Sequence, residues 1–446
     1  MTAARAARST ILDANAFDAE PDETTADGRL IARRRRLMGP AYRLFYEEPV
    51  RPVRGAGAKL YDQEGNEYLD VYNNVASVGH AHPRVVEAIA RQSAQLSTHT
   101  RYLSEPLVDY AEDLLSTMPG GIRRLMLTCT GSEANDLAVR IARRVTGGTG
   151  IIITREAYHG NTELVSGLSP ALGGGMALGS DVWTVPAPDT YRSTADVGAE
   201  FARDVRAALA EMAAAGVAPA ALLVDTIFSS DGVYASPPGF LRAAVDAVRA
   251  AGGVHIADEV QPGFGRTGSA FWGFQRHGLV PDLVTMGKPM GNGYPVAAVA
   301  GSADAVDAWA EDVPYFNTFG GNNVAVAAAQ AVLDVIREEG LQEHASQVGR
   351  YFRGQLLELA ARHRAIGDVR GDGAFTGLEL VSALDRRTPD GALAARVVNG
   401  LRRRRVLTSV CGPDGAVLKL RPPLPFTRAD ADRFVTELDA VLQTED

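Results

Sequence analysis

The chain has 446 residues, of which 46% are hydrophobic and 22% are charged, a composition typical of a globular protein with more than one core. Its formal net charge of −9 opposes binding to nucleic acid and to anionic membranes. Two cysteines give neither a disulfide framework nor metal-ligand spacing, and no membrane span or apolar leader is visible, so we expect a cytoplasmic protein without a metal.

Lysine is scarce in this sequence. Of the 45 lysine and arginine residues, only Lys59, Lys288 and Lys419 are lysine. The two dense basic runs, residues 33–36 and 402–405, consist of arginine and lie in segments with a helical pattern, for which exposed, ion-paired faces are expected. A reaction that needs a lysine amine therefore has few candidate residues.

The first elements along the chain are short. Residues 1–28 are rich in Ala, Asp, Glu and Thr, and we expect a mobile arm there. Turn residues 63–66 separate two strand-like runs and predict a hairpin over residues 59–71. Proline opens an amphipathic helix predicted over residues 83–96.

Apolar runs then alternate with helical segments. We predict strands at 125–128, 150–154, 220–225, 254–258 and 283–286, and helices at 133–145 and 238–251. Runs that are apolar at every position are typical of a largely parallel sheet covered on both faces, which predicts an α/β fold.

A long helix over residues 323–339 is predicted to leave the sheet for a smaller α+β region with short strands near 376–381 and 417–420. We therefore divide the chain into an arm (1–28), a large domain (77–322) and a small domain built from residues 29–76 and 323–446.

Polar residues gather where the predicted strands end, which is where open parallel sheets bind ligands. Gly131 and Ser132 begin a helix whose free N–H groups suit a phosphate, although an ordinary helix cap fits them equally well. Tyr158 can lie flat on a heteroaromatic ring. Asp258 and Lys288 follow two further strands, and burial would lower the pKa of this lysine and make its amine nucleophilic.

Residues 263–268 spell G-x-G-x-x-G after a predicted strand, as in dinucleotide-binding proteins. That motif should open a helix and be followed by an acid about 20 residues later. The next residues instead indicate a turn, and the nearest downstream acid is Asp282, so we expect no dinucleotide.

The combination at the strand ends is more specific than its parts. A lysine for a Schiff base, an aspartate for a pyridine nitrogen, a phosphate-binding helix start and a stacking aromatic ring are together what pyridoxal 5'-phosphate requires. The residues therefore predict this cofactor.

The sequence resembles the class III aminotransferases, pyridoxal phosphate enzymes of fold type I, over residues 40–440. The resemblance rests on residues 79–83, 130–135, 158–160, 258–268, Lys288 and 318–322. It implies a seven-stranded, mostly parallel sheet in the large domain. It also implies a homodimer, or a dimer of dimers, with active sites at the subunit interface.

The resemblance also implies individual roles. Lys288 would form the Schiff base and Asp258 would pair with the pyridine nitrogen. The other implied cofactor contacts are Gly131 and Ser132 at the phosphate, Tyr158 and Val260 on the ring faces, Gln261 near the ring hydroxyl, His159, Asp225, and Thr318, which would reach the phosphate of the neighbouring subunit. Asp225 is a departure, because the family usually has a longer glutamate followed by proline there.

Substrate contacts are implied in the same way. Arg421 matches the family arginine that binds a substrate carboxylate. Residues 74–80 and 100–103 resemble the alanine–glyoxylate-aminotransferase-like phospho-lyases, which makes Asn74 and Arg101 further candidates.

The first functional hypothesis is transfer of an amino group from a primary amine or amino acid to a keto acid or aldehyde. The alternative is elimination of phosphate and ammonia from an O-phosphorylated amino alcohol such as phosphoethanolamine. Racemase or mutase chemistry, and a non-catalytic binding protein on the same fold, follow these two.

Overall fold

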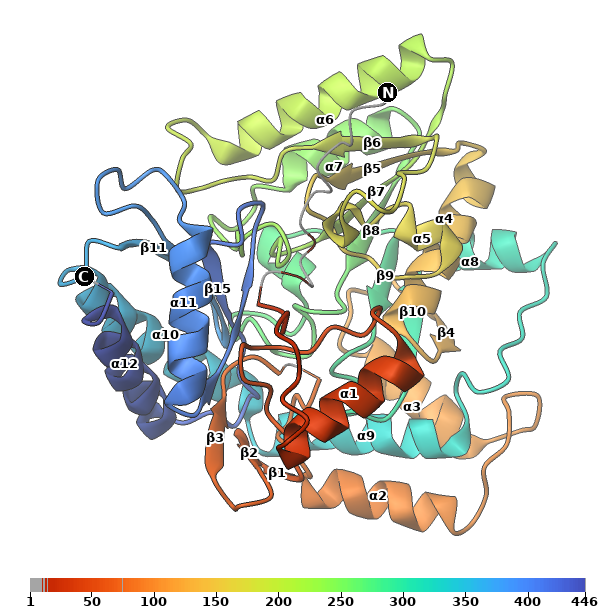
Figure 1. Ribbon diagram of the computed structural model, residues 1–446. Coiled ribbons are helices and arrows are strands. Elements are labelled where there is room, and N and C mark those ends of the chain that lie inside the picture. The colour runs from red at the N-terminus through yellow and green to blue at the C-terminus, as the bar shows by residue number, and fades with distance from the viewer. Residues whose placement is uncertain (1–9, 11–12, 14, 74, 446) are drawn as a thin grey trace.

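The structure, a computed structural model, describes residues 10, 13, 15–73 and 75–445. Its largest sheet has seven strands (Figure 1). In spatial order they are β4 (Arg124–Thr128), β10 (Ala297–Gly301), β9 (Leu283–Met286), β8 (Val254–Asp258), β7 (Pro219–Asp225), β5 (Gly150–Thr154) and β6 (Val182–Val185). β10 is antiparallel to both neighbours and the other pairs are parallel, which confirms the predicted mostly parallel sheet.

Helices on both faces explain why these strands are apolar throughout. Ile151 of β5 packs in one cluster with α4 (Gly131–Thr146), whereas Ile152 packs in another with α6 (Val197–Ala214) and α7 (Arg242–Ala250). Successive side chains of a strand point to opposite faces, so both faces of the sheet must be apolar. The sheet is the middle layer between these helices.

Further helices complete the large α/β body. α2 (Pro83–Ser93), α3 (Glu105–Leu115) and α9 (Asn323–Glu338) contact one another beside β4, and α8 (Ala303–Ala310) packs on α4. The short helices are α5 (Glu163–Ser166), η1 (Pro170–Leu172) and η2 (Gly273–His277).

The smaller α+β region contains two four-stranded sheets and a core of its own. One sheet consists of β1 (Arg54–Ala56), β2 (Lys59–Tyr61), β3 (Glu67–Asp70) and β13 (Val406–Leu407), and the other of β11 (Ile366–Asp372), β12 (Phe375–Leu380), β15 (Val417–Leu420) and β14 (Ser409–Cys411). The helices of this region are α10 (Leu341–Ala360), α11 (Gly391–Arg403) and α12 (Arg428–Leu442). Val406 of β13 pairs in parallel with Leu69 of β3, so both ends of the chain build this region.

Several predicted limits differ from the structure by a few residues; the helix predicted over residues 83–96, for example, ends at Ser93. Two further differences have a clear local cause. The helix predicted from residue 238 begins at Arg242, because the prolines at 237 and 238 lie in a turn before it. α1 (Ala26–Met38) begins inside the predicted arm, where the Thr25 side chain caps it by accepting from the N–H of Gly28.

Part of the predicted arm contacts the smaller region. Asn15 is buried and accepts a hydrogen bond from the Ser409 hydroxyl at 2.9 Å, and Ala16 forms a β-bridge with Phe45. Residues 1–9, 11, 12 and 14 lie outside the described residues. This contact joins the start of the described chain to β14.

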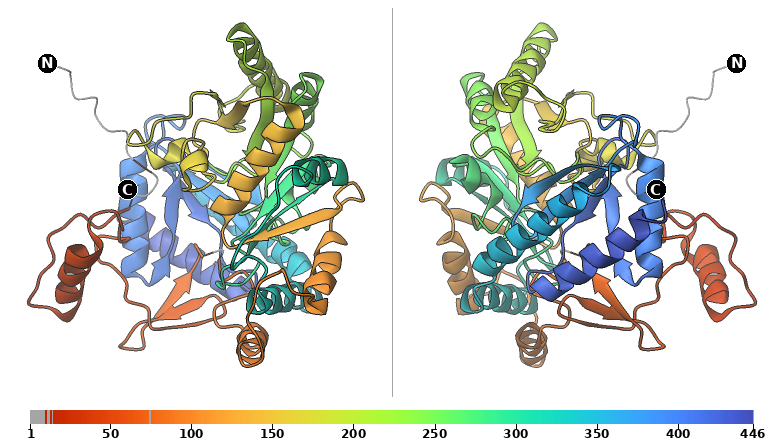
Figure 2. Two further views of the ribbon diagram at one scale, coloured as in Figure 1. Left: turned by 90° about the vertical axis from the view of Figure 1, so that its right-hand side faces the viewer. Right: turned by 90° about the vertical axis from the view of Figure 1, so that its left-hand side faces the viewer.

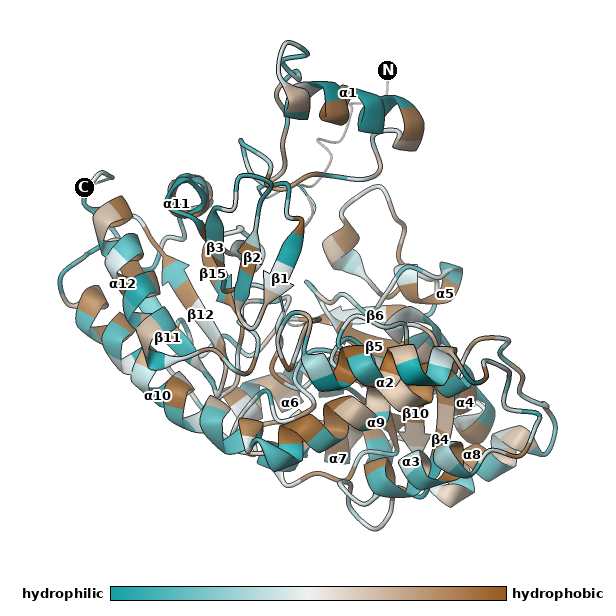
Figure 3. Ribbon diagram, turned by 90° about the horizontal axis from the view of Figure 1, so that it is seen from below, coloured by the Kyte–Doolittle hydropathy of each residue, from teal (hydrophilic) through white to brown (hydrophobic). Residues whose placement is uncertain are grey.

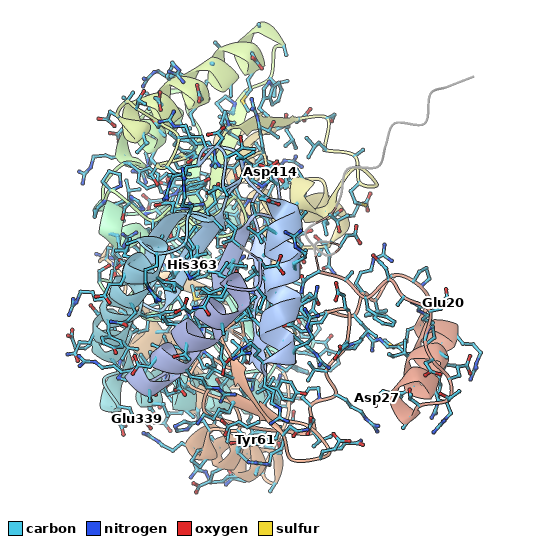
Figure 4. All side chains as sticks on the ribbon, turned by 60° about the vertical axis from the view of Figure 1, so that its left-hand side comes forward. Glu20, Asp27, Tyr61, Glu339, His363 and Asp414 are labelled. Carbon is cyan, nitrogen blue, oxygen red and sulfur yellow. The ribbon has the colours of Figure 1, made fainter. Side chains whose placement is uncertain are left out.

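The helix α1 projects from the body of the molecule (Figure 2). Its basic run is ion-paired, with Arg35 3.3 Å from Glu20, which Figure 4 labels beside this helix. The run near residue 402 is paired in the same way, with Arg402 2.6 Å from Glu48. Apolar side chains of α1 remain exposed, among them Leu30 and Leu37. Figure 3 shows hydrophobic and hydrophilic residues interspersed along this helix, which stands away from the rest of the molecule. None of the helices in the described residues is both long and apolar enough to cross a bilayer.

Candidate active site

Lys288 lies just beyond the carboxyl end of β9 and is half-buried. Burial and the nearby guanidinium of Arg421 lower the pKa of its amine to about 8, while Asp258 and Asp225 oppose this shift. A larger share of the amine is therefore neutral near neutral pH than for an exposed lysine, and the neutral amine is the nucleophilic form.

Asp258 ends β8 and is surrounded by hydrogen-bond donors. Its Oδ2 accepts from Asn135 Nδ2 at 2.9 Å and lies 2.7 Å from Nδ1 of His159, while its Oδ1 accepts from the backbone N–H of Val260 at 3.0 Å. Asn135 is itself oriented by Thr285, whose hydroxyl donates to Oδ1 at 2.6 Å. These contacts fix the carboxyl group at the strand end with its oxygens as hydrogen-bond acceptors.

The helix α4 begins beside this carboxylate. Thr130 and Glu133 cap each other's backbone N–H groups in a capping box, which fixes the first turn. Gly131 and Ser132 follow at the positively polarised end of the helix dipole, where a phosphate is stabilised. The backbone at Gly160 passes so close to Ser132 that a Cβ on residue 160 would lie 2.5 Å from Ser132 Oγ. The φ of 138° at this residue also requires glycine.

A hollow of about 100 Å³ joins these groups. Its lining is Gly131, Ser132, Asn135, Tyr158, His159, Gly160, Asp225, Asp258, Val260, Gln261 and Lys288. The structure therefore brings together all of the expected cofactor contacts except Thr318.

Asp225 ends β7 directly beside Asp258, its neighbour in the sheet. Its carboxylate accepts from the N–H of Ile227 at 3.0 Å and from both the N–H and the hydroxyl of Ser229. Burial raises the pKa of this carboxyl and the charge of Asp258 raises it further, while these donors and Lys419 oppose the shift. Two adjacent carboxylates favour a cation between or beside them.

Arg421 follows β15 and enters the site from the smaller region. Its guanidinium donates to Oε1 of Gln261 and lies 4.2 Å from the centre of the Tyr72 ring. Both contacts place a planar cation next to the hollow, in position to bind an anionic part of a substrate.

Two expected site residues are not brought to the hollow. Thr318 is exposed, and Arg101 is exposed with its guanidinium 6.0 Å from the centre of the Phe316 ring. Asn74 lies outside the described residues.

Two functional candidates were missed at the sequence level. Asn135 belongs to the motif at residues 130–135, and its spacing within the helix would have placed it on the face of Gly131. Lys419 has no motif of its own, yet it is buried, and its ammonium interacts electrostatically with Asp225, Lys288 and Arg421. Only the packing of β15 against the loop after β7 reveals this position.

The residues of the hollow fit pyridoxal phosphate. Glycines at 131 and 160 leave room where side chains would collide with Val260 and Ser132. The buried Nε2 of His159 has no hydrogen-bond partner among the described residues. Ser132 and the start of α4 can hold a phosphate, Asp258 a protonated ring nitrogen, and Lys288 an aldehyde carbon.

The fold and this hollow define a fold-type I pyridoxal phosphate enzyme. Residues 45–442 match the family model "Aminotransferase class-III". The chain therefore belongs to the class III aminotransferase family, and its cofactor is pyridoxal 5'-phosphate.

Two curated relatives resemble most of the chain. The alanine–glyoxylate aminotransferase 2-like protein of Drosophila melanogaster is 43% identical over 419 residues, covering 91% of this chain and 85% of the relative. The ethanolamine-phosphate phospho-lyase homolog 1 of Caenorhabditis elegans is 38% identical over 434 residues and covers 93% of each.

The similar solved structures also include both a phospholyase and an aminotransferase. A phospholyase from Arthrobacter in complex with phosphoethanolamine has a TM-score of 0.90 and 43% identity, covering 93% of this chain and 99% of that one. An aminotransferase of Bacillus anthracis has a TM-score of 0.84 and 26% identity, covering 96% and 100%.

Proposed function

We propose that this chain is a phospho-lyase that eliminates phosphate and ammonia from an O-phosphorylated amino alcohol such as phosphoethanolamine. The carrying observation is the set of basic side chains at the site, where the guanidinium of Arg421 and the buried amine of Lys419 lie near Lys288. A phosphate monoester carries a charge of about −1.5 to −2 at neutral pH, which balances these basic side chains better than a single carboxylate does.

Similarity supports the same reaction. The Arthrobacter phospholyase shares 43% of residues with this chain, against 26% for the Bacillus anthracis aminotransferase. The two were compared over nearly the same share of the chain, so the difference reflects the sequences rather than the coverage.

Most residues of the hollow have a role in this proposal. Bound pyridoxal phosphate supplies a ring that withdraws electrons from the substrate. Lys288 would hold the cofactor by its aldehyde carbon and, once displaced by the substrate amine, would be placed to take the proton from the carbon next to that amine. Asp258 keeps the ring nitrogen protonated, and Gly131 and Ser132 bind the cofactor phosphate.

The remaining contacts are assigned as follows. Tyr158 and Val260 cover the ring faces, Gln261 lies near the ring hydroxyl, and His159 holds Asp258 in place. Arg421 binds the phosphate of the substrate through its planar, permanently charged guanidinium.

Transamination to a keto acid is the second candidate. It is favoured by the name of the Drosophila relative and by the larger part of the family to which the chain belongs. Lys288 and Asp258 would serve both reactions, because both begin with loss of the same proton.

We also propose a homodimer in the cytoplasm. Thr318 and Arg101 are exposed in the single chain, and a second subunit would bring a phosphate to Thr318. The exposed apolar side chains of α1 give such a subunit a surface to cover.

The proposal is tested by incubating the holoenzyme with phosphoethanolamine and no keto acid. We expect phosphate, ammonia and acetaldehyde in equal amounts over many turnovers. Activity that requires a keto acid and releases no phosphate would establish the second candidate instead.

A further inference from the structure

Elimination of phosphate from a monoester requires a proton donor. When the carbon–oxygen bond breaks, its electron pair stays on the bridging oxygen. A dianionic ester would then depart as trivalent phosphate, which is a strong base and a poor leaving group. A proton delivered to the bridging oxygen gives hydrogen phosphate, and a positioned acid typically accelerates such a step by about 10²–10⁴-fold.

Most charged groups at the site cannot supply this proton. An arginine guanidinium stays protonated in proteins, so Arg421 does not give up a proton. The carboxyl oxygens of Asp225 and Asp258 already accept hydrogen bonds from the protein, so neither oxygen pair is free to act at the substrate. Lys288 is already assigned to the first proton transfer, at the carbon next to the substrate amine.

Lys419 is the second lysine near the site, after Lys288. It is 3% exposed and pairs with Ser409 of β14 and Gly377 of β12 in the middle of the sheet. Val417, two residues earlier on the same face, packs with Ile227 and Phe375 in a small apolar cluster. Lys419 therefore faces the loop that follows Asp225.

The placement of this sheet against the loop is fixed by hydrogen bonds. The N–H of Gly412 donates to the carbonyl of Ser230 at 3.0 Å, and Nε of Arg370 donates to the carbonyl of Gly232 at 2.9 Å. These bonds hold β14 and β11 to the segment after β7. Because β15 lies between those two strands in the sheet, Lys419 is held facing the segment that follows Asp225.

The surroundings of the Lys419 amine suit a group that gives and regains a proton. Its Nζ lies 5.8 Å from the centre of the Phe375 ring, and no side chain in the described part of the chain forms an ion pair or hydrogen bond with it. Burial, together with the charges of Arg421 and Lys288, lowers its pKa to about 7 against the opposing effect of Cys411 and Asp225. An acid with a pKa near the working pH is the most effective proton donor.

We propose that Lys419 donates the proton that the departing phosphate needs. The inference rests on the proposed elimination reaction. The carbon–oxygen bond breaks with its electron pair on oxygen, the proton moves from Nζ to that oxygen, and the amine of Lys419 takes a proton from water before the next turnover. Arg421 anchors the phosphate but does not take part in proton transfer.

The test compares two leaving groups. Ethanolamine O-sulfate has the shape of phosphoethanolamine, but sulfate is the anion of a strong acid and leaves without a proton. We expect Lys419→Met and Lys419→Arg each to slow phosphate release by about 10²-fold or more and to leave sulfate release within a few-fold of the wild-type rate. Lys59→Met, a change of the half-exposed lysine on β2, is the matched control and should change neither rate.

A second measurement does not depend on turnover. With ¹³C-labelled lysine, the holoenzyme contains three labelled side chains, and Lys419→Arg assigns one signal. We expect that signal to titrate near pH 7 and to shift to a higher pKa when inorganic phosphate is added.

Several results would overturn the inference. Normal phosphate release by Lys419→Arg would show that only the charge matters, and equal loss of phosphate and sulfate release would place Lys419 in an earlier step. A signal that titrates near the ordinary lysine pKa and ignores phosphate would exclude the role even if the enzyme proved to be an aminotransferase. A wild-type enzyme that releases no phosphate would instead refute the proposed function.

Discussion

The carboxylate of Asp258 is held by three donors from three different segments. Asn135 comes from α4, His159 from the loop after β5, and the N–H of Val260 from its own turn. Because each donor is positioned by a separate element, the carboxylate can hold a ring nitrogen in one place without moving during turnover.

The assignment of the Schiff-base residue is tested by Lys288→Ala. We expect purified Lys288→Ala to lack the absorbance of cofactor bound to the protein and to lose at least about 10³-fold in turnover, because no other lysine lines the described hollow. Lys59→Ala is the control. Persistence of the covalent cofactor absorbance in Lys288→Ala would contradict the assignment.

At the residue level, the sequence predicted those site residues that belong to a motif and also follow an apolar strand. Lys288, Asp258 and Tyr158 stand at strand ends that apolar runs revealed, and the structure places all three at one hollow. Lys419 could not be found in this way, because its position depends on the register of β15 with β12 and β14, which local sequence does not determine.

At the start of α4, the phosphate site depends on a close contact between the helix and the loop after β5. Gly160 approaches Ser132 so closely that the loop after β5 and the helix can meet only if residue 160 has no Cβ. The phosphate site is therefore made by the contact between two elements and not by the helix alone.

The change Gly160→Ala should weaken cofactor binding. We expect the dissociation constant for pyridoxal phosphate to rise at least about tenfold, because the added methyl group displaces Ser132 and the residue is strained at positive φ. A titration of the apoenzyme followed by absorbance measures it.

The matched control is Gly147→Ala at the other end of α4. Its φ is also positive, at 68°, but a Cβ there meets nothing within 4 Å. We expect a loss of about 1 kcal/mol in stability and unchanged cofactor affinity. Equal affinity losses in both variants would show that strain, and not the contact with Ser132, is responsible.

Element prediction succeeded for strands buried on both faces and failed where the pattern is weak. β5, β8 and β9 begin and end at the predicted residues. β10 reads Ala-Ala-Val-Ala-Gly and was not predicted, because its small side chains fit beneath helices without a strong strand signature. Only the first turn of α1 was assigned to the arm, because its polar residues do not bury a face within this chain.

On the scale of the whole molecule, buried acids couple stability to pH. Asp231 is buried at the contact between the two regions, and burial raises the pKa of its carboxyl to about 7. The folded state then holds a proton that the unfolded state releases at lower pH, so this group stabilises the fold at acidic pH and its contribution is lost as the pH rises toward 7.

Asp231→Asn should remove this dependence. Between about pH 4 and 7, we expect the free energy of unfolding of the wild type to fall relative to that of Asp231→Asn by on the order of 2–4 kcal/mol. Denaturant unfolding at several pH values measures the difference, and parallel pH profiles would contradict the account.

The proposed dimer is a property of the whole assembly. Leu37 on α1 is 69% exposed, and Leu37→Glu would place a charge in the proposed interface. We expect at least about a tenfold weaker dimer by sedimentation analysis. Leu384→Glu, at a residue that is 96% exposed in a loop of the smaller region, should leave the assembly unchanged.

The most direct test of the central claim is a single turnover followed by cofactor absorbance. Holoenzyme mixed with a slight deficit of phosphoethanolamine should release one equivalent each of phosphate and ammonia, and the cofactor should return to its resting spectrum. Accumulation of the pyridoxamine form, with the phosphate ester bond intact, would contradict the account.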